Sequence, residues 1–176
     1  MSTIQLDKAH SSINFQVKHM MVSKAKGQFQ DFDIQVDGDV NDLENLKIEA
    51  TIKVDSIDTN QADRDAHLKS DDFFSAEENP EIKFVSKSIK KVDEDTYDLT
   101  GDVTIKGVTN EETFTVNFNG MGKEPMQGNT IAGFDFSGKI NREAYGLTWN
   151  ATLETGGVLV GRDVKVNGEL EFVVTE

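Results

Sequence analysis

Apolar and polar residues alternate along most of the chain. The clearest example is "LKIEATIKVDSI", residues 46–57, where every second residue from Leu46 to Val54 is apolar and the residues between them are polar. A period of two places the two sets on opposite faces of a β-strand, whereas a helix would distribute them around its circumference. Shorter versions of the pattern predict further strands around residues 13–17, 32–36, 82–84, 97–105, 114–118, 134–136, 147–153 and 164–172.

These stretches amount to eight or nine strands, separated by turn signals such as "DGD", "GKEPMQGN" and "TGG". Strands with one polar face favour an antiparallel sheet, and both a two-sheet sandwich and a closed barrel bury one face of every strand. Read as one strand, residues 46–57 would span ~40 Å, which favours the barrel. Phe29 and Phe32 have opposite parity and therefore predict a bulge or bend between them.

One segment interrupts the alternation. "TNQADRDAHLKS" predicts a short helix around residues 60–70, with Asn60 as its N-cap, acidic residues early and Lys69 late. We expect it across a barrel mouth or along the barrel side, held to the core by Phe73 and Phe74. Pro80 should restart an extended strand.

Length, cysteine content and net charge exclude several classes of site and partner. A length of 176 residues predicts one domain, residues 1–176, and the absence of cysteine excludes disulfides and thiolate sites. A net charge of −14 argues against nucleic acid and against an anionic membrane as partners. The chain begins without a basic region and apolar run, and no apolar run approaches ~20 residues, so we expect a cytoplasmic protein without stable membrane insertion.

Several blocks together resemble the YceI-like family: "LDKAHSSINFQVKHM", "KGQFQDF", "RDAHLKSDDFF" with "PEIKF", "LTGDVTIKGVT" and "INREAYGL". The resemblance covers nearly the whole chain. It implies an all-β fold, an extended eight-stranded antiparallel lipocalin-like β-barrel. It also implies a long apolar ligand inside the barrel, such as a polyisoprenoid, an isoprenoid quinone or a fatty amide, and a homodimer. Many members of the family are exported, whereas this chain shows no signal peptide.

The inward parity and the resemblance together select the candidate ligand-binding residues. An apolar chain gains about 0.8 kcal/mol per methylene that leaves water, so an oily lumen could bind it without a charged contact. The abundance of Phe, 11 residues against 2 Tyr and 1 Trp, suits such a lining. The apolar candidates are Phe15, Val17, Ile34, Ile48, Ile52, Phe84, Leu99, Val103, Phe134, Phe136, Trp149 and Leu153, any of which could instead be plain core.

Three polar residues join this set: His19, which shares the inward parity, and Arg64 and His67 of the predicted helix. Each has a structural alternative, a hydrogen-bonded core histidine for His19 and a capping and salt-bridge network for the helix pair. We expect Arg142 to pair with an acidic neighbour rather than with ligand. No metal or cofactor is expected, since the histidine spacing matches no metal motif. A hydrolase or isomerase acting on a lipid-like substrate, and a protein-binding module, are the alternatives to a lipid carrier.

Overall fold

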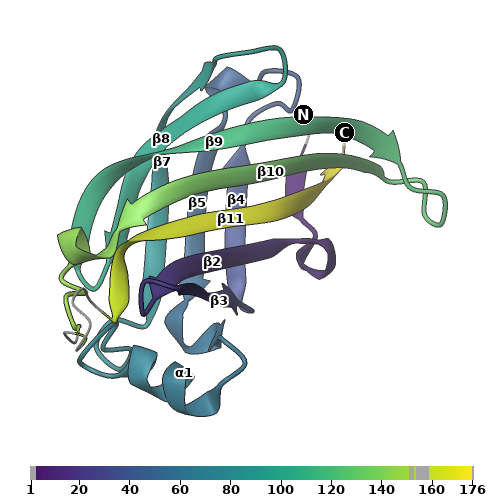
Figure 1. Cartoon of the computed structure of the whole chain (residues 1–176). Coiled ribbons are helices and arrows are strands. Elements are labelled where there is room, and N and C mark those ends of the chain that lie inside the picture. Colours follow the sequence, from purple (N-terminus) through teal and green to yellow (C-terminus); the bar gives the residue numbers. More distant parts are fainter. Residues whose placement is uncertain (1–2, 151–152, 154–158, 176) are drawn as a thin grey trace.

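A computed structural model describes residues 3–150, 153 and 159–175. One antiparallel sheet dominates it (Figure 1). Its strands are β1 (Thr3–Leu6), β2 (Ser12–His19), β3 (Ser23–Phe29), β4 (Phe32–Asp37), β5 (Lys47–Lys53), β6 (Ile57–Asp58), β7 (Glu81–Lys91), β8 (Thr96–Ile105), β9 (Val108–Lys123), β10 (Thr130–Asn141) and β11 (Val160–Thr175). The helical elements are α1 (Ala62–Lys69) and the 3-10 turns η1 (Lys8–His10), η2 (Leu43–Asn45), η3 (Val54–Ser56) and η4 (Arg142–Tyr145).

The sheet closes on itself. Strands β1, β4, β5, β7, β8, β9, β10 and β11 are neighbours in that order, and β11 pairs again with β1. Strand β11 also pairs with β2 along its first part, and β3 and β6 follow beside β2. The predicted eight-stranded antiparallel barrel is therefore confirmed, and the sandwich is excluded.

Three neighbouring strands of the barrel are broken at one level. The breaks are η1 between β1 and β2, a bend at Gln30 between β3 and β4, and η3 between β5 and β6. The last two are joined, because the Gln30 amide donates to the Ser56 carbonyl at 3.1 Å and the Lys53 amide donates to the Asp31 carbonyl at 2.9 Å. The barrel wall therefore bends at these three breaks, which lie side by side in neighbouring strands.

This bend in the wall explains why one prediction from the alternating pattern is confirmed and another is wrong. Phe29 and Phe32 are both buried, although their parities differ, because the predicted bend lies between them. The prediction that residues 46–57 form one long strand is wrong, since η3 divides it. Val54 and Ile57 are both buried, which an unbroken strand with a period of two would not allow.

The predicted helix is confirmed as α1, at one end of the barrel (Figure 1). The prediction of Asn60 as its N-cap is wrong: Gln61 occupies that position, and Asn60 has a left-handed backbone with a φ of 63°. Phe73 is buried in the core cluster and Phe74 packs against it, as expected. Strand β7 starts at Glu81, directly after Pro80.

The strand expected around residues 147–153 is also not found. Leu147 to Asn150 and Leu153 have no strand structure, and Ala151 lies outside the described residues. Leu147 is nevertheless buried, and Trp149 packs against the core cluster. Their apolar side chains therefore serve packing at the end of the barrel rather than a strand face.

Candidate ligand-binding cavity

The inward faces of the strands enclose a cavity of about 300 Å³. For scale, a cavity of about 150 Å³ lined by aliphatic and aromatic side chains is large enough to bind benzene. The cavity reaches from Val160 to Phe172 along β11, which is roughly 40 Å of strand at about 3.3 Å per residue. The interior is therefore hollow and elongated.

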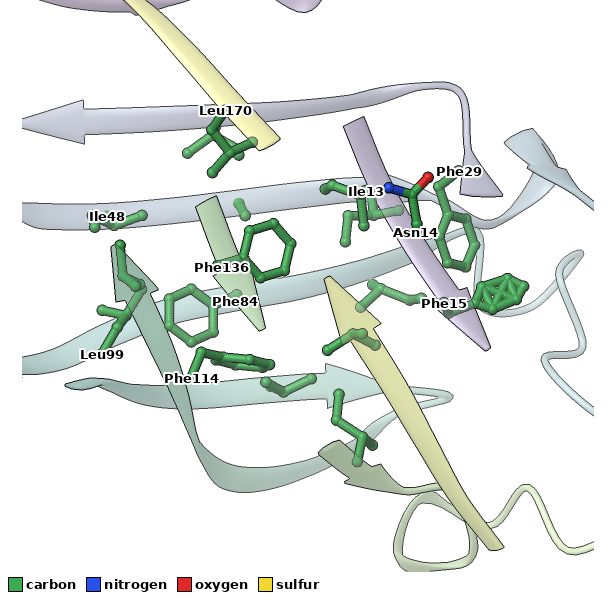
Figure 2. Close-up of a pocket in the computed structure, with 18 of the residues that line it drawn as sticks. Ile13, Asn14, Phe15, Phe29, Ile48, Phe84, Leu99, Phe114, Phe136 and Leu170 are labelled. Atoms are coloured by element: carbon green, nitrogen blue, oxygen red, sulfur yellow. The ribbon is translucent and has the colours of Figure 1, made fainter. Parts of the chain in front are cut away.

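Most of the apolar candidates lie where their parity placed them. Figure 2 shows several of them around the cavity. The predicted residues that line it are Phe15, Val17, Ile34, Ile48, Ile52, Phe84, Leu99, Val103, Phe134 and Phe136. Many of these, including Phe84 and Leu99, are only partly buried although they point inward, because their inner surfaces face the hollow rather than another side chain. Their contact with a ligand stays a prediction.

Glycines on the inner face make room for the aromatic rings. A Cβ on Gly138 would lie 2.4 Å from the Phe114 ring, and a Cβ on Gly168 would lie 2.5 Å from the Phe136 ring. The rings therefore rest against the wall over a neighbouring strand instead of filling the centre. Phe84, Phe114 and Phe136 form a continuous edge-to-face series, with ring centroids 5.8 and 6.3 Å apart (Figure 2). This arrangement keeps the middle of the barrel open.

Among the described residues, the lining contains three with polar side chains: Asn14, Tyr97 and Arg142. It contains no carboxylate, histidine, lysine or hydroxyl of Ser or Thr. General acid–base and nucleophilic catalysis need such groups within reach of the substrate. Of the groups that such catalysis uses, the described lining offers the phenol of Tyr97 alone.

Arg142 is the charged member of the lining, and its environment differs from the expectation. Instead of an acidic neighbour, its guanidinium donates to backbone carbonyls: Nε to Gly161 at 2.7 Å, Nη1 to Leu147 at 2.5 Å and Trp149 at 3.1 Å, and Nη2 to Val160 at 3.3 Å. Burial lowers the pKa of Arg142 below its usual range. The side chain joins the end of β10, the segment after η4 and the start of β11.

The remaining predicted site residues do not line the cavity. His19 is half-buried at the end of β2, and Leu153 is half-buried outside the strands. Trp149 contacts two other rings, with its centroid 4.7 Å from His67 and 5.5 Å from Phe73. His67 and Trp149 therefore pack against Phe73, which does line the cavity, without lining it themselves.

The polar side chains of α1 bind the residues that flank the helix, namely Thr59 directly after β6 and Asp72 in the turn after α1. Arg64 donates through Nε to the Thr59 hydroxyl at 2.8 Å and through Nη2 to the Thr59 carbonyl at 2.6 Å. Asp65 accepts from the Thr59 amide at 2.9 Å, and His67 Nε2 lies 2.8 Å from Asp72 Oδ2. These contacts correspond to the structural alternative for Arg64 and His67.

Sequence reasoning missed several lining residues. Leu68, Phe73 and Phe74 reach the cavity from α1 and the turn after it, and Phe114 and Leu170 reach it from β9 and β11. The parity of Phe114 and Leu170 in their alternating strands would have found them. Phe73 and Phe74 were expected to hold the α1 segment to the core, but the local pattern does not show that the segment would also line the cavity, which depends on the tertiary structure.

Asp7, His10 and Glu171 form a polar cluster on the outer surface, where β1 passes into β2 beside β11. His10 Nδ1 lies 2.8 Å from Asp7 Oδ2 and 3.2 Å from Glu171 Oε2. Among the described residues, their ligand atoms are the group close enough together to hold a metal ion. Ser11 completes the cluster, since its hydroxyl donates to the Asp7 carbonyl and accepts from the Glu171 amide. The cluster therefore fastens the closing edge of the barrel.

The charges of this cluster predict a pH-dependent contribution to stability. The hydrogen bond with Asp7 raises the pKa of His10 above 6.5, and the same bond lowers the pKa of Asp7 below 3.8. The stabilisation from His10 is thus complete below pH 6.5 and is lost as the pH rises through the raised pKa of His10. The stabilisation from Asp7 is lost as the pH falls through the lowered pKa of Asp7. Burial, followed by the hydrogen bond with Asp7, raises the pKa of Glu171. This group therefore also makes the folded protein more stable at low pH than at high pH.

We therefore expect His10→Asn to reduce the urea midpoint of unfolding most between about pH 5 and 6, with the difference from the unmodified chain disappearing at high pH. Urea titrations of both proteins across this range measure it. Lys8→Gln, in the same 3-10 turn but outside the ion pairs of the cluster, is the control. A loss that is the same at every pH would contradict the assignment.

A closed antiparallel barrel with an elongated apolar interior defines this chain as a lipocalin-like protein in architecture. Residues 4–172 match the model of the YceI-like domain. The chain belongs to the YceI-like family.

Relatives of known sequence and structure agree with this assignment. UPF0312 proteins of Staphylococcus epidermidis and Staphylococcus aureus are each 51% identical to the chain, over 99% and 100% of both chains respectively. The crystal structure of Burkholderia cenocepacia BcnA superimposes with a TM-score of 0.82 at 26% identity, covering 95% of this chain and 99% of that one. A Campylobacter jejuni YceI protein gives 0.75 at 33% identity, covering 98% of both chains.

The same fold also occurs in a protein of much lower sequence identity. A polyisoprenoid binding domain from Saccharophagus degradans, implicated in plant cell wall breakdown, has a TM-score of 0.70 and covers 99% of this chain and 100% of that one. Its sequence identity is 13%, so the likeness shows the shared barrel alone.

Proposed function

We propose that this protein is a binding protein that holds a long apolar lipid, such as a polyisoprenoid, an isoprenoid quinone or a fatty amide, inside its barrel for storage or transport. The observation that carries the proposal is the elongated cavity, whose described lining is almost entirely apolar. Ten methylenes moved from water into such a lining gain about 8 kcal/mol before the costs of immobilising the ligand are subtracted. A hydrocarbon tail can thus bind without a charged contact.

The comparisons support the proposal indirectly. The domain from Saccharophagus degradans that shares this barrel is a polyisoprenoid binding domain. The described lining holds no carboxylate, histidine, lysine, serine or threonine, and Tyr97 is the one group in it with an ionisable hydroxyl. This composition favours a binding protein over a lipid hydrolase or isomerase.

Organic extraction of the purified protein, followed by mass spectrometry, tests the proposal. We expect a long-chain lipid in roughly stoichiometric amount, and we expect the extracted protein to take up an added long-chain polyprenol, seen as a mass increment in native mass spectrometry. The polyprenol should be recovered unchanged after incubation. An extract without lipid, together with no uptake of the polyprenol, would contradict the proposal, and a chemically altered polyprenol would favour the enzyme.

Two other properties stay predictions. The homodimer implied by the family resemblance can be measured by light scattering after size exclusion, and the cytoplasmic location by cell fractionation. No helix in the described part of the chain is long and apolar enough to cross a bilayer.

A further inference from the structure

The tip of the β2–β3 hairpin exposes three consecutive apolar residues: Met20, Met21 and Val22, with exposed fractions of 46%, 56% and 86%. Met20 and Met21 have positive φ values of 55° and 63°. A tight hairpin turn with two positive φ values is ordinarily made by Asn-Gly, and bulky residues rarely adopt this backbone. Turn formation therefore does not account for methionine at these positions.

The hairpin is also basic, in contrast to the rest of the molecule. The chain has a net charge of −14, yet residues 8–30 contain no Asp or Glu and include Lys8, Lys18, Lys24 and Lys26. Lys18 and Lys24 lie directly opposite each other in the strand pair, and both are exposed. Like charges in that position destabilise a hairpin. Within the described residues, neither has an ion-pair partner.

This basic, apolar tip stands at the rim of the cavity. The Met20 amide donates to the Leu159 carbonyl at 2.8 Å, and His19 is paired with Val160, which lines the cavity. Arg142 binds the Val160 carbonyl from the other side. Figure 1 shows the hairpin ending beside the start of β11, at the same end of the barrel as α1.

We propose that Met20, Met21 and Val22 insert into the surface of a bilayer that contains anionic phospholipid, docking this end of the barrel on a membrane from which an apolar ligand can enter or into which it can leave. Three apolar side chains at a hairpin tip are too few for a stable protein–protein interface, which buries about 800 Å² on each partner. An interfacial anchor needs only a small apolar tip and nearby lysines that attract anionic headgroups.

The acidic remainder of the molecule does not prevent such docking. Salt screens charges beyond a Debye length of about 8 Å at physiological ionic strength. The acidic residue near the hairpin on β11, Asp163, forms an ion pair with Arg162 at 3.7 Å. Once the tip touches the membrane, the headgroups therefore interact with the local lysines more than with acidic residues farther away. Docking is peripheral and reversible, which agrees with the expectation of no stable membrane insertion. The anionic bilayer, however, departs from the expectation drawn from the net charge of −14, because the local charge of the tip is positive. The inference rests on the proposed function for its purpose, because it supplies the route between membrane and cavity.

Flotation of the intact protein with vesicles tests the proposal. We expect binding to vesicles of phosphatidylglycerol and phosphatidylcholine in equal parts, weaker binding to phosphatidylcholine alone, and loss of binding as salt is raised. The triple variant Met20→Asn, Met21→Gly, Val22→Ser suits the turn better than the natural residues and so should fold at least as well. Its affinity for the mixed vesicles should nevertheless fall about tenfold or more.

Two further variants separate the parts of the docking surface. Lys18→Gln with Lys24→Gln and Lys26→Gln should lower the affinity for mixed vesicles by about tenfold or more and remove its salt dependence. Met126→Ser is the matched control, since Met126 is 92% exposed at the β9–β10 turn, beside the end of β11 opposite to Val160. It should leave binding unchanged.

Three results would overturn the proposal: wild-type protein that does not float with mixed vesicles, a tip variant that binds as well as wild type, or a Met126→Ser variant that loses as much binding as the tip variant. Organic extraction of the same preparation keeps the two proposals distinct. A protein that carries lipid but ignores vesicles contradicts the docking alone, and one that docks but neither carries nor takes up lipid contradicts the proposed cargo alone.

Discussion

Replacing Gly138 by alanine is expected to reduce the affinity for a long-chain polyprenol about tenfold or more while the barrel still folds. A Cβ at this position would lie 2.4 Å from Cδ1 of Phe114, and its close contacts are all with that ring. No backbone atom stands in the way, so the ring can relieve the clash by tilting away from the wall. The space on its other side is the cavity, which Phe114 lines. The tilted ring would then occupy volume that the lipid needs.

The cost to the fold should be smaller than the effect on binding. Overpacking of this kind typically destabilises by about 1–3 kcal/mol. Titration of extracted protein with the polyprenol measures the affinity, and urea unfolding measures the stability.

Gly133→Ala on the same strand is the matched control. The nearest atom to a Cβ there is Cβ of Asn119, at an ordinary contact distance of 3.8 Å. Gly133 has the outward parity of β10, whereas Gly138 shares the inward parity of Phe134 and Phe136. We expect Gly133→Ala to bind polyprenol as the unmodified protein does. Equal affinities for the two variants would mean that the cavity is not the lipid site.

Replacing Arg142 by methionine is expected to destabilise the protein by about 3–5 kcal/mol. The side chain is 5% exposed, and its guanidinium donates to four backbone carbonyls. Methionine has a comparable length and no donor, so these carbonyls would lose a charge-assisted partner. A hydrogen bond to a charged group contributes about 1.5–3 kcal/mol, and water that reaches some of the carbonyls would offset part of the loss. Urea unfolding measures the change in the free energy of unfolding.

Arg162→Met, at an exposed position on neighbouring β11, is the control for the loss of one positive charge. Arg162 approaches Asp163 at 3.7 Å with a side chain that is 64% exposed. Such surface pairs contribute little, so we expect a change within about 0.5 kcal/mol. Comparable losses at Arg142 and Arg162 would show that the carbonyl contacts of Arg142 do not hold the barrel end together.

The "INREAYGL" block of the family resemblance acquires a physical meaning from this site. Arg142 joins three chain segments, and the Tyr145 hydroxyl donates to Glu112 Oε2 at 2.6 Å from a fully buried ring. Burial, followed by the bond to Glu112, raises the pKa of Tyr145, so the phenol stays protonated and continues to donate. Gly146 ends the turn with a φ of 80°, a backbone that favours glycine. These residues close the end of the barrel, and Arg142 also lines the cavity.

The inward and outward faces of the strands could be predicted from the sequence. Ile48, Phe84 and Phe136 line the cavity as their parity implies, because a period of two in the side chains is a local property of the extended backbone. The helix at residues 62–69 also followed from local preferences. The alternating pattern alone left both a sandwich and a barrel possible, and the family resemblance predicted the closed barrel.

Other features depend on contacts between distant segments, which periodicity does not encode. The break at Val54 exists because the wall bends where three strands meet, and the run from Leu147 became a packed loop because Arg142 binds its carbonyls. Alternation determined which side chains face inward, but not whether they would meet in the middle. The tertiary structure decided that, since the glycines opposite Phe114 and Phe136 let these rings lie against the wall and leave a hollow between the strands.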